Sequence, residues 1–340
     1  MPSVPESIRE IEGLGLQQLT DEILTSTEPL VLRGLVSSWP IVKAALDSQQ
    51  AADAYLRRFY QGDVVTVMHG TPDIGDRFFY NHDLSGFNYA SSRVKLDVVL
   101  DALREHRLND KAPAIYIGSS MIDNYLPGFR AENDIESDFL REHAPLVNIW
   151  IGNRTRIPAH FDLPDNIACV AAGRRRFTLF PPDQLSNLYV GPLDFTPAGQ
   201  PVSLVDFAQP DFEKYPRFKS ALAAAQTAEL EAGDALFIPS MWWHHIQALE
   251  SFNILINYWW RQSPAYMDTP LNTLMHALLT IRDLPREQRV AWQELFRHYV
   301  FESNGAEASH IPPQARGILA PFNDDSARTL RAALLNKMKR

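Results

Sequence analysis

The chain has 340 residues, of which 45% are hydrophobic and 21% are charged, so it has the composition of an ordinary folded protein with a sizeable core. Its 32 Lys and Arg against 41 Asp and Glu give a net charge of −9, which excludes the broadly basic surface of a general nucleic-acid-binding protein. The single cysteine, Cys169, excludes an intrachain disulfide framework. The sequence has neither a signal-peptide pattern at its start nor an apolar run of about 18 residues, so we expect a cytoplasmic protein without membrane or nucleic-acid partners.

The first part of the chain, residues 1–112, mixes strand and helix signals. Residues 29–36 form a short apolar run bounded by proline and glycine, which predicts a strand. A second strand is predicted at residues 64–68, which are rich in β-branched side chains. Apolar residues at helical spacing predict a helix over 96–103. We expect an N-terminal α/β segment that packs on the domain that follows.

From residue 113 to 262 the pattern changes to short apolar segments separated by turn formers, which is typical of a β-sandwich or barrel. Residues 183–225 are irregular and predict a long insertion, with a helix near 218–230. The predicted strands are residues 114–117, 146–152, 167–172, 176–180, 235–239 and 252–259.

The last part of the chain, residues 263–340, carries helix signals only. Apolar residues recur at helical spacing from 271 to 281, a second helix begins at Pro285, and a third is predicted over 326–338. Such helices make a small core by themselves. We therefore expect them to pair with a second copy of the chain, with capping of the barrel as the alternative.

One histidine is followed two residues later by a carboxylate, and these residues are His160 and Asp162. In an extended strand such residues point to the same face. Two histidines and a carboxylate on one side of an ion form the facial triad of non-heme iron oxygenases. The pair alone also fits an ordinary surface strand. The third ligand is either His244 or His245, because neighbouring strand residues face opposite sides, and strand geometry does not choose between them.

Four segments together resemble the JmjC (cupin-8) oxygenases, and most of all the asparaginyl hydroxylases among them: residues 29–40, 157–162, 172–182 and 232–246. The resemblance covers roughly residues 25–262. It implies a mainly β fold with flanking helices, in which a double-stranded β-helix, or jelly roll, holds iron in its open mouth. It also implies that His244 is the third metal ligand beside His160 and Asp162, and that His245 faces away.

The same resemblance implies Fe(II) as cofactor and 2-oxoglutarate as cosubstrate. The far carboxylate of 2-oxoglutarate would meet Arg175 and Tyr116, while Asn166 and Asn257 would lie around the cosubstrate. Two positions depart from the family pattern. Arg175 stands where lysine is usual, and Arg is larger and binds carboxylates bidentately. Ile157 replaces a threonine, so that one hydroxyl contact is missing, and Thr155 is the candidate replacement.

The resemblance implies an enzyme that hydroxylates a protein or peptide side chain and releases succinate and CO₂. No catalytic residue beyond the metal ligands is required, since the oxidising power belongs to the cofactor. The aromatic stretch 78–87 would line a peptide groove, or else anchor the N-terminal segment. The alternatives are a small-molecule hydroxylase with the same mechanism and a non-catalytic cupin-like metal-binding protein. The C-terminal helices predict a homodimer, as in the asparaginyl hydroxylases.

Overall fold

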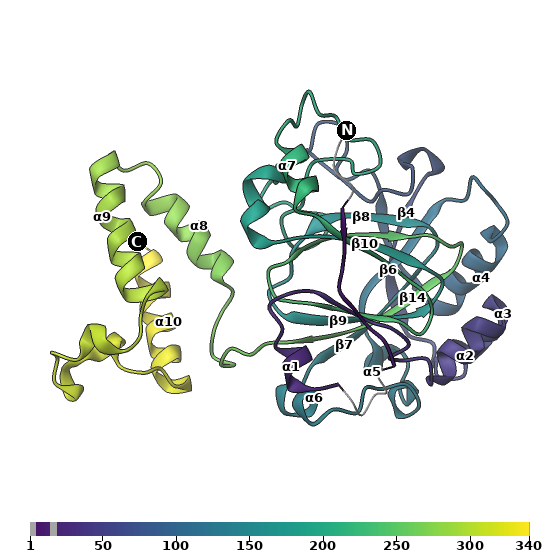
Figure 1. Ribbon diagram of the computed structural model, residues 1–340, viewed down its shortest axis with the longest axis horizontal. Coiled ribbons are helices and arrows are strands. Elements are labelled where there is room, and N and C mark those ends of the chain that lie inside the picture. The colour runs from purple at the N-terminus through teal and green to yellow at the C-terminus, as the bar shows by residue number, and fades with distance from the viewer. Residues whose placement is uncertain (1–4, 14–18, 340) are drawn as a thin grey trace. The chain divides into compact units, whose positions relative to one another are not determined.

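A computed structural model describes residues 5–13 and 19–339 of the chain. Its first part is built on two β-sheets, which form separate layers in Figure 1. The smaller sheet contains, in spatial order, β1 (Glu6–Ser7), β11 (Gln226–Leu230), β10 (Arg175–Phe180), β13 (Trp243–Ala248) and β8 (Thr155–His160). The larger sheet contains β2 (Glu10–Ile11), β3 (Leu30–Leu32), β12 (Ala235–Ile238), β9 (Asp165–Ala172), β14 (Asn253–Trp260), β7 (Leu146–Gly152), β6 (Ala114–Met121), β4 (Val64–Gly70) and β5 (Ala90–Lys95).

The space between the two sheets is filled by apolar side chains from both of them. Phe177 and Leu179 alternate along β10 with partly or fully exposed residues, and they pack with Val170 of β9 and Leu236 of β12. β9 is buried along its whole length, because one face meets the smaller sheet and the other meets the helices. The fold is therefore the predicted jelly roll, with its interior between the sheets.

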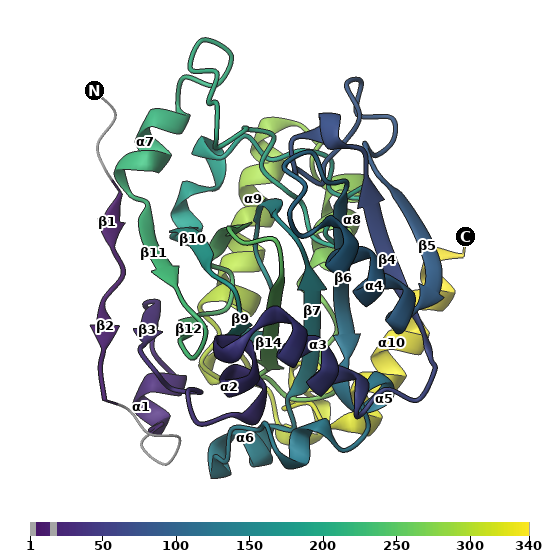
Figure 2. The same cartoon turned by 90° about the vertical axis from the view of Figure 1, so that its right-hand side faces the viewer.

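Helices cover the outer face of the larger sheet, as Figure 2 shows for α2 (Pro40–Asp47), α3 (Gln49–Arg57) and α4 (Leu96–His106). α2 begins at Pro40, a residue favoured in the first helical turn. Its buried face adds to the largest apolar cluster, which includes strand residues such as Ile256 and Val67. Because β4 and β5 lie in the larger sheet, the segment 1–112 supplies strands of this sheet as well as helices that pack on its outer face. Short helices also occur at α1 (Asp21–Leu24), α5 (Ile122–Tyr125) and α6 (Asp138–His143).

The insertion between β10 and β11 lies against the outer face of the smaller sheet through Phe218 of α7 (Phe218–Ala223), which packs with Phe180 and Trp243. The predicted helix over 218–230 is wrong in its second half, because residues 226–230 form β11. There Thr227 Oγ1 donates a hydrogen bond to the Phe177 carbonyl at 2.9 Å. Pairing with β10 thus outweighs the helical propensity of the alanine-rich sequence before it.

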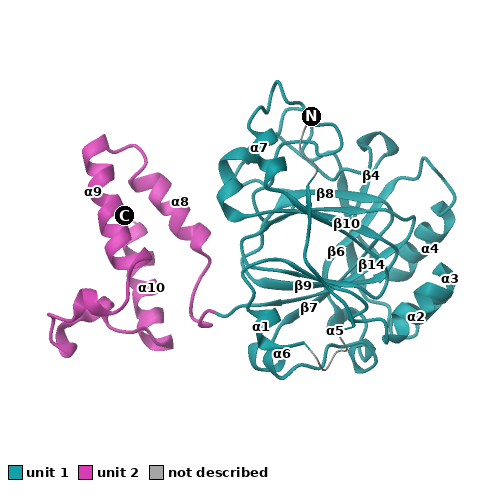
Figure 3. Cartoon of the chain, viewed as in Figure 1, with its two compact units in different colours: residues 1–262 teal, residues 263–340 magenta. Residues whose placement is uncertain are grey.

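The chain divides into two compact units, residues 1–262 and 263–340, coloured separately in Figure 3. The second unit contains α8 (Pro270–Thr280), α9 (Arg286–Phe296) and α10 (Asp324–Met338). Pro285 precedes α9 as its N-cap rather than opening it. None of the residues of these three helices, all within the described chain, is buried. No helix in the described residues is long and apolar enough to cross a membrane.

Candidate metal centre

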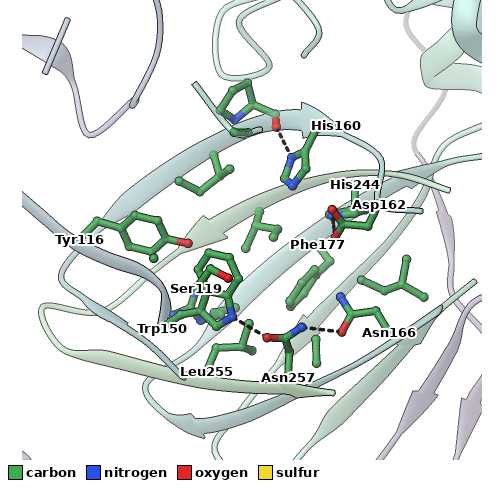
Figure 4. A pocket seen from close by; sticks show the side chains of 18 of the residues that line it. Tyr116, Ser119, Trp150, His160, Asp162, Asn166, Phe177, His244, Leu255 and Asn257 are labelled. Atoms are coloured by element: carbon green, nitrogen blue, oxygen red, sulfur yellow. Dashed lines mark hydrogen bonds and ion pairs between the residues drawn. The ribbon is translucent and has the colours of Figure 1, made fainter. Parts of the chain in front are cut away.

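Three side chains from two paired strands converge inside the barrel. His160 ends β8, and its strand partner on β13 is His244, so the two imidazoles lie side by side with ring centroids 4.4 Å apart. Asp162 follows β8 directly, and its Oδ2 lies 3.5 Å from His244 Nε2. One candidate ligand atom from each of the three residues lies within 4.8 Å of the others. Figure 4 shows the three side chains at one end of the cavity.

Both histidines have one ring nitrogen fixed by the backbone. His160 Nδ1 lies 2.9 Å from the Pro158 carbonyl, and His244 Nδ1 lies 3.0 Å from the Trp242 carbonyl. A carbonyl oxygen only accepts hydrogen bonds, so each Nδ1 must carry the proton. Each Nε2 then keeps a free lone pair. This is the tautomer that a metal ligand needs, fixed by a second hydrogen bond as is usual for ligating histidines.

The protonation of the cluster also suits a cation. Burial first, and then the neighbouring His244, lower the pKa of His160 to about 4, so the imidazole is neutral at pH 7. Burial alone would raise the pKa of Asp162, but its contact with the His244 imidazole, the largest of the opposing effects, holds it below its ordinary value. An ionised carboxylate beside a neutral imidazole is the state that binds a metal ion.

His245, the neighbour of His244, points to the other side of β13. Its ring stacks on Phe207 at a centroid distance of 4.6 Å, and it is not among the residues that line the cavity. Burial first, and then the nearby Arg156 and Arg77, lower its pKa to about 3. Strand alternation therefore leaves His244 as the histidine of this pair that faces the interior.

Arg175 and Tyr116 lie at the predicted cosubstrate positions and line the same cavity. Arg175 is 1% exposed, yet its Nε has no hydrogen-bond partner in the described chain and no carboxylate there forms an ion pair with it. Burial lowers the pKa of Arg175, and only Tyr116 offsets this. The Tyr116 hydroxyl, whose pKa is raised by burial, points into the cavity in Figure 4. An unpaired buried cation is costly, so the site is built to receive an anion.

The neighbouring arginines face away from the cavity, as expected from strand alternation. Arg174 Nε donates to Glu250 Oε1 at 2.7 Å, and Arg176 pairs with Glu229. Both ion pairs lie on the exposed outer face of β10. The three consecutive arginines of this segment therefore have different environments, and only the middle one serves the cavity.

Asn166 and Asn257, the other predicted cosubstrate residues, also line the cavity and are hydrogen-bonded to each other. Asn257 Nδ2 donates to Asn166 Oδ1 at 3.2 Å, and Trp150 Nε1 donates to Asn257 Oδ1 at 2.7 Å. Both amides are buried, at 6% and 1% exposure. The structure thus brings the predicted metal ligands and the four predicted cosubstrate residues into one cavity.

The cavity that contains these groups has a volume of about 270 Å³ and is lined mostly by apolar side chains. Ile157 lines it as expected, but Thr155 does not, so Thr155 supplies no replacement hydroxyl there. Ser119 lies in the lining instead, on a β-bulge of β6 where its φ is +36°. Sequence reasoning missed Ser119 and Trp150, because a bulge leaves no periodic signal and a strand tryptophan looks like an ordinary core residue.

The aromatic stretch 78–87 has two roles near the cavity. Phe78 is part of the lining. Tyr80 donates its hydroxyl proton to the Phe195 carbonyl, and Phe87 stacks on the Phe195 ring at 4.7 Å. These contacts hold the loop that brings Pro197 and Ala198 to the cavity wall. The stretch therefore contributes to the cavity wall and supports the loop around Phe195, and its role in a peptide groove stays a prediction.

Comparisons with known proteins agree with this geometry. Residues 16–266 match the family model described as Cupin-like domain. The chain is 31% identical over 182 residues to the tRNA wybutosine-synthesizing protein 5 of Gallus gallus, a match that covers 49% of this chain and 52% of that protein. It is 31% identical over 129 residues to the lysine-specific demethylase JMJ31 of Arabidopsis thaliana, with 36% of this chain and 23% of that protein covered. It is 26% identical over 260 residues to the lysine-specific demethylase 8 of Xenopus tropicalis, with 75% and 53% covered. The chain thus spans about half the length, or less, of these relatives.

Proposed function

This chain belongs to the Cupin-like domain family, which includes JmjC proteins, and we propose that it is an Fe(II)- and 2-oxoglutarate-dependent oxygenase that hydroxylates a side chain of a protein or peptide. The observation that carries the proposal is the combination of a two-histidine, one-carboxylate cluster with a buried Arg175 that has no ion-pair partner among the described residues of the same protein.

The residues present fit both groups. Two imidazole Nε2 atoms and one carboxylate form the ligand set of non-heme Fe(II), with positions left for other ligands. Asp162 and Arg175 are the charged side chains in the cavity lining, and their charges cancel. A divalent ion therefore brings two uncompensated positive charges into a buried site. The dianion 2-oxoglutarate neutralises them, and one of its carboxylates satisfies Arg175.

In this proposal, His160, Asp162 and His244 hold the metal, and Arg175 and Tyr116 bind the far carboxylate of the oxo acid. Iron with bound 2-oxoglutarate supplies the oxidising chemistry, in which O₂ is consumed, the oxo acid becomes succinate and CO₂, and one oxygen atom enters the substrate. The chain contributes orientation and exclusion of water. Apolar residues such as Met68, Phe78 and Ile157 keep the surroundings of the reacting bond dry.

A macromolecular substrate is favoured by the size of the cavity. At about 270 Å³ it lies below the roughly 300–1,000 Å³ of typical small-molecule pockets, and the oxo acid takes part of it. The remaining space suits one side chain that enters from outside. The names of the relatives, which refer to lysine demethylation and to tRNA modification, also point to large substrates. The proposed reaction is hydroxylation of a protein side chain.

The test is succinate formation by the purified protein with Fe(II), 2-oxoglutarate and O₂, compared with His160→Ala. We expect turnover in the wild-type protein, even slowly without substrate, and none above background in the variant. Equal succinate formation by both would refute the metal assignment. Binding of the inert analogue N-oxalylglycine, measured by calorimetry, separates an oxygenase from a non-catalytic metal-binding protein, since the latter would not bind it. Peptide and metabolite libraries then distinguish a protein hydroxylase from a small-molecule one.

A further inference from the structure

Three side chains linked in series by hydrogen bonds form one wall of the metal cavity, called its floor below. Trp150 Nε1 donates to Asn257 Oδ1 at 2.7 Å, and Asn257 Nδ2 donates to Asn166 Oδ1 at 3.2 Å. All three residues line the cavity, and both amides are buried. Figure 4 shows the two hydrogen bonds in line, with the indole at one end and Asn166 at the other, nearer to Asp162 and His244.

The indole determines the orientation of both amides. An indole N–H donates and never accepts, so the Asn257 atom that faces it must be the oxygen. The nitrogen of Asn257 then faces Asn166, which must turn its own oxygen toward that donor. The nitrogen of Asn166 is left on the other side, and it has no hydrogen-bond partner among the described residues. Without the indole, either amide could rotate by 180° and present an oxygen where it now presents a nitrogen.

Trp150 is itself held firmly by its neighbours. Its ring stacks on Tyr116 with centroids 6.0 Å apart and meets Trp259 edge-on at 5.8 Å. Gly118 leaves room for it, because a Cβ at that position would lie 3.3 Å from Trp150 Cζ3. Packing therefore fixes the direction of the indole N–H, and one residue touches both Tyr116 and the amide pair. Such support from a neighbouring shell is what holds ligand-binding groups in place.

We propose that Trp150 is a positioning residue that orients Asn257 and, through it, Asn166, so that the Asn166 amide nitrogen faces the cavity as a donor to an anionic ligand. In the wrong orientation Asn166 would present an oxygen, which repels a carboxylate. The ligand chemistry is that of an oxo acid, so the inference rests on the proposed function and deepens it. Trp150 would thus determine which amide atoms face the cavity without itself contacting the metal.

The experiment measures 2-oxoglutarate binding by calorimetry to protein loaded with Mn(II), which avoids turnover. Trp150→Phe keeps the aromatic packing and removes the N–H donor, and we expect about tenfold weaker oxo acid binding with Mn(II) affinity unchanged. The matched control is Trp39→Phe, which also removes a buried indole hydrogen bond, from Trp39 Nε1 to the Asp134 carbonyl at 3.1 Å, but outside the cavity. The control is expected to bind like the wild type.

A double-variant cycle separates positioning from simple packing. Asn257→Leu removes the hydrogen bonds between Trp150 and Asn166 without changing the aromatic rings. It tests the same link should Trp150→Phe fold poorly. If Trp150 acts through Asn257, the double variant binds the oxo acid no more weakly than Asn257→Leu alone. Losses that multiply, or wild-type affinity in Trp150→Phe, would overturn the inference. A wild-type protein that binds Mn(II) but no oxo acid would overturn the proposed function, and the inference with it.

Discussion

His244 and His245 are consecutive residues of β13, yet their imidazoles lie in different environments on opposite sides of the smaller sheet. His244 Nε2 lies 3.5 Å from Asp162 Oδ2 inside the cavity. His245 stacks on Phe207 outside it, near Arg77, Arg156 and Asp206. The two residues therefore provide a matched pair, in which one change should alter the site and the other should not.

The first prediction concerns metal binding. We expect His244→Ala to weaken the binding of Fe(II) or Mn(II) by at least about a hundredfold, because one of three ligands is lost. His245→Gln should bind the metal within about twofold of the wild type. Anaerobic calorimetric titration of the two variants checks this, and equal losses in both would show that the assignment of faces is wrong.

The second prediction concerns Arg175, whose replacement should weaken 2-oxoglutarate binding without lowering the stability of the ligand-free protein. Arg175→Met removes a buried cation that has no ion-pair partner in the described part of the chain, so the ligand-free variant should unfold at a temperature no lower than the wild type. The same variant should bind 2-oxoglutarate about a hundredfold more weakly, since a bidentate charged contact is lost. Arg175→Lys should recover part of the affinity.

Thermal unfolding and calorimetry, each with the metal affinity measured in parallel, test this prediction. A large loss of stability in Arg175→Met would mean that the guanidinium supports the fold rather than a ligand. Unchanged 2-oxoglutarate affinity would mean that the oxo acid lies elsewhere in the cavity.

The third prediction is a pH dependence of stability caused by His245. Its pKa is about 3 in the folded protein, because of burial first and then the nearby arginines, against about 6.5 in an unfolded chain. The unfolded state therefore takes up the proton first as the pH falls. Stability from this residue is complete above pH 6.5 and is lost toward pH 3, at about 1.4 kcal/mol per pH unit.

Urea unfolding of metal-free protein between pH 4 and 8 measures this slope. Below pH 6.5, the free energy of unfolding should fall more steeply with decreasing pH in the wild type than in His245→Gln. The difference in slope corresponds to the uptake of about one proton. Buried His160 contributes the same slope to both proteins, so the difference isolates His245. Parallel curves over the whole range would contradict the prediction.

The fourth prediction concerns the second unit, which we propose forms a homodimer with its counterpart in another copy of the chain. It carries exposed apolar side chains, including Leu279 of α8 at 82% exposure and Phe301, five residues after α9, at 78%. Solvent-exposed apolar surface of this extent is unusual in a monomer. Light scattering of the full chain should give twice the monomer mass. The double change Trp292→Glu and Leu295→Glu should give the monomer, whereas Arg282→Glu on the same unit should not.

A monomeric mass for the wild-type protein would contradict the proposed homodimer. Oxo acid binding by the monomeric variant is a separate measurement. Because all the cavity residues lie in residues 1–262, it is expected to stay within about threefold of the wild type.

The sequence by itself indicated a mainly β core, several of its strands and the candidate metal ligands, because these follow from local patterns. Alternation between short apolar segments and turn formers predicted the strands, and the spacing of His160 and Asp162 predicted a shared face. Resemblance to a family chose His244, where strand geometry left two histidines open. It also selected Arg175, Tyr116, Asn166 and Asn257, without indicating what else surrounds them.

Only the tertiary structure decided which groups meet across the barrel. Pairing of β13 with β8 brings His244 opposite His160. Pairing of residues 226–230 with β10 makes them a strand, despite the helical pattern before them. The bulge that brings Ser119 into the cavity, and the hydrogen bond from Trp150 to Asn257, join residues far apart in the chain. Such contacts depend on strand register and packing between sheets, and no periodicity in a single sequence records them.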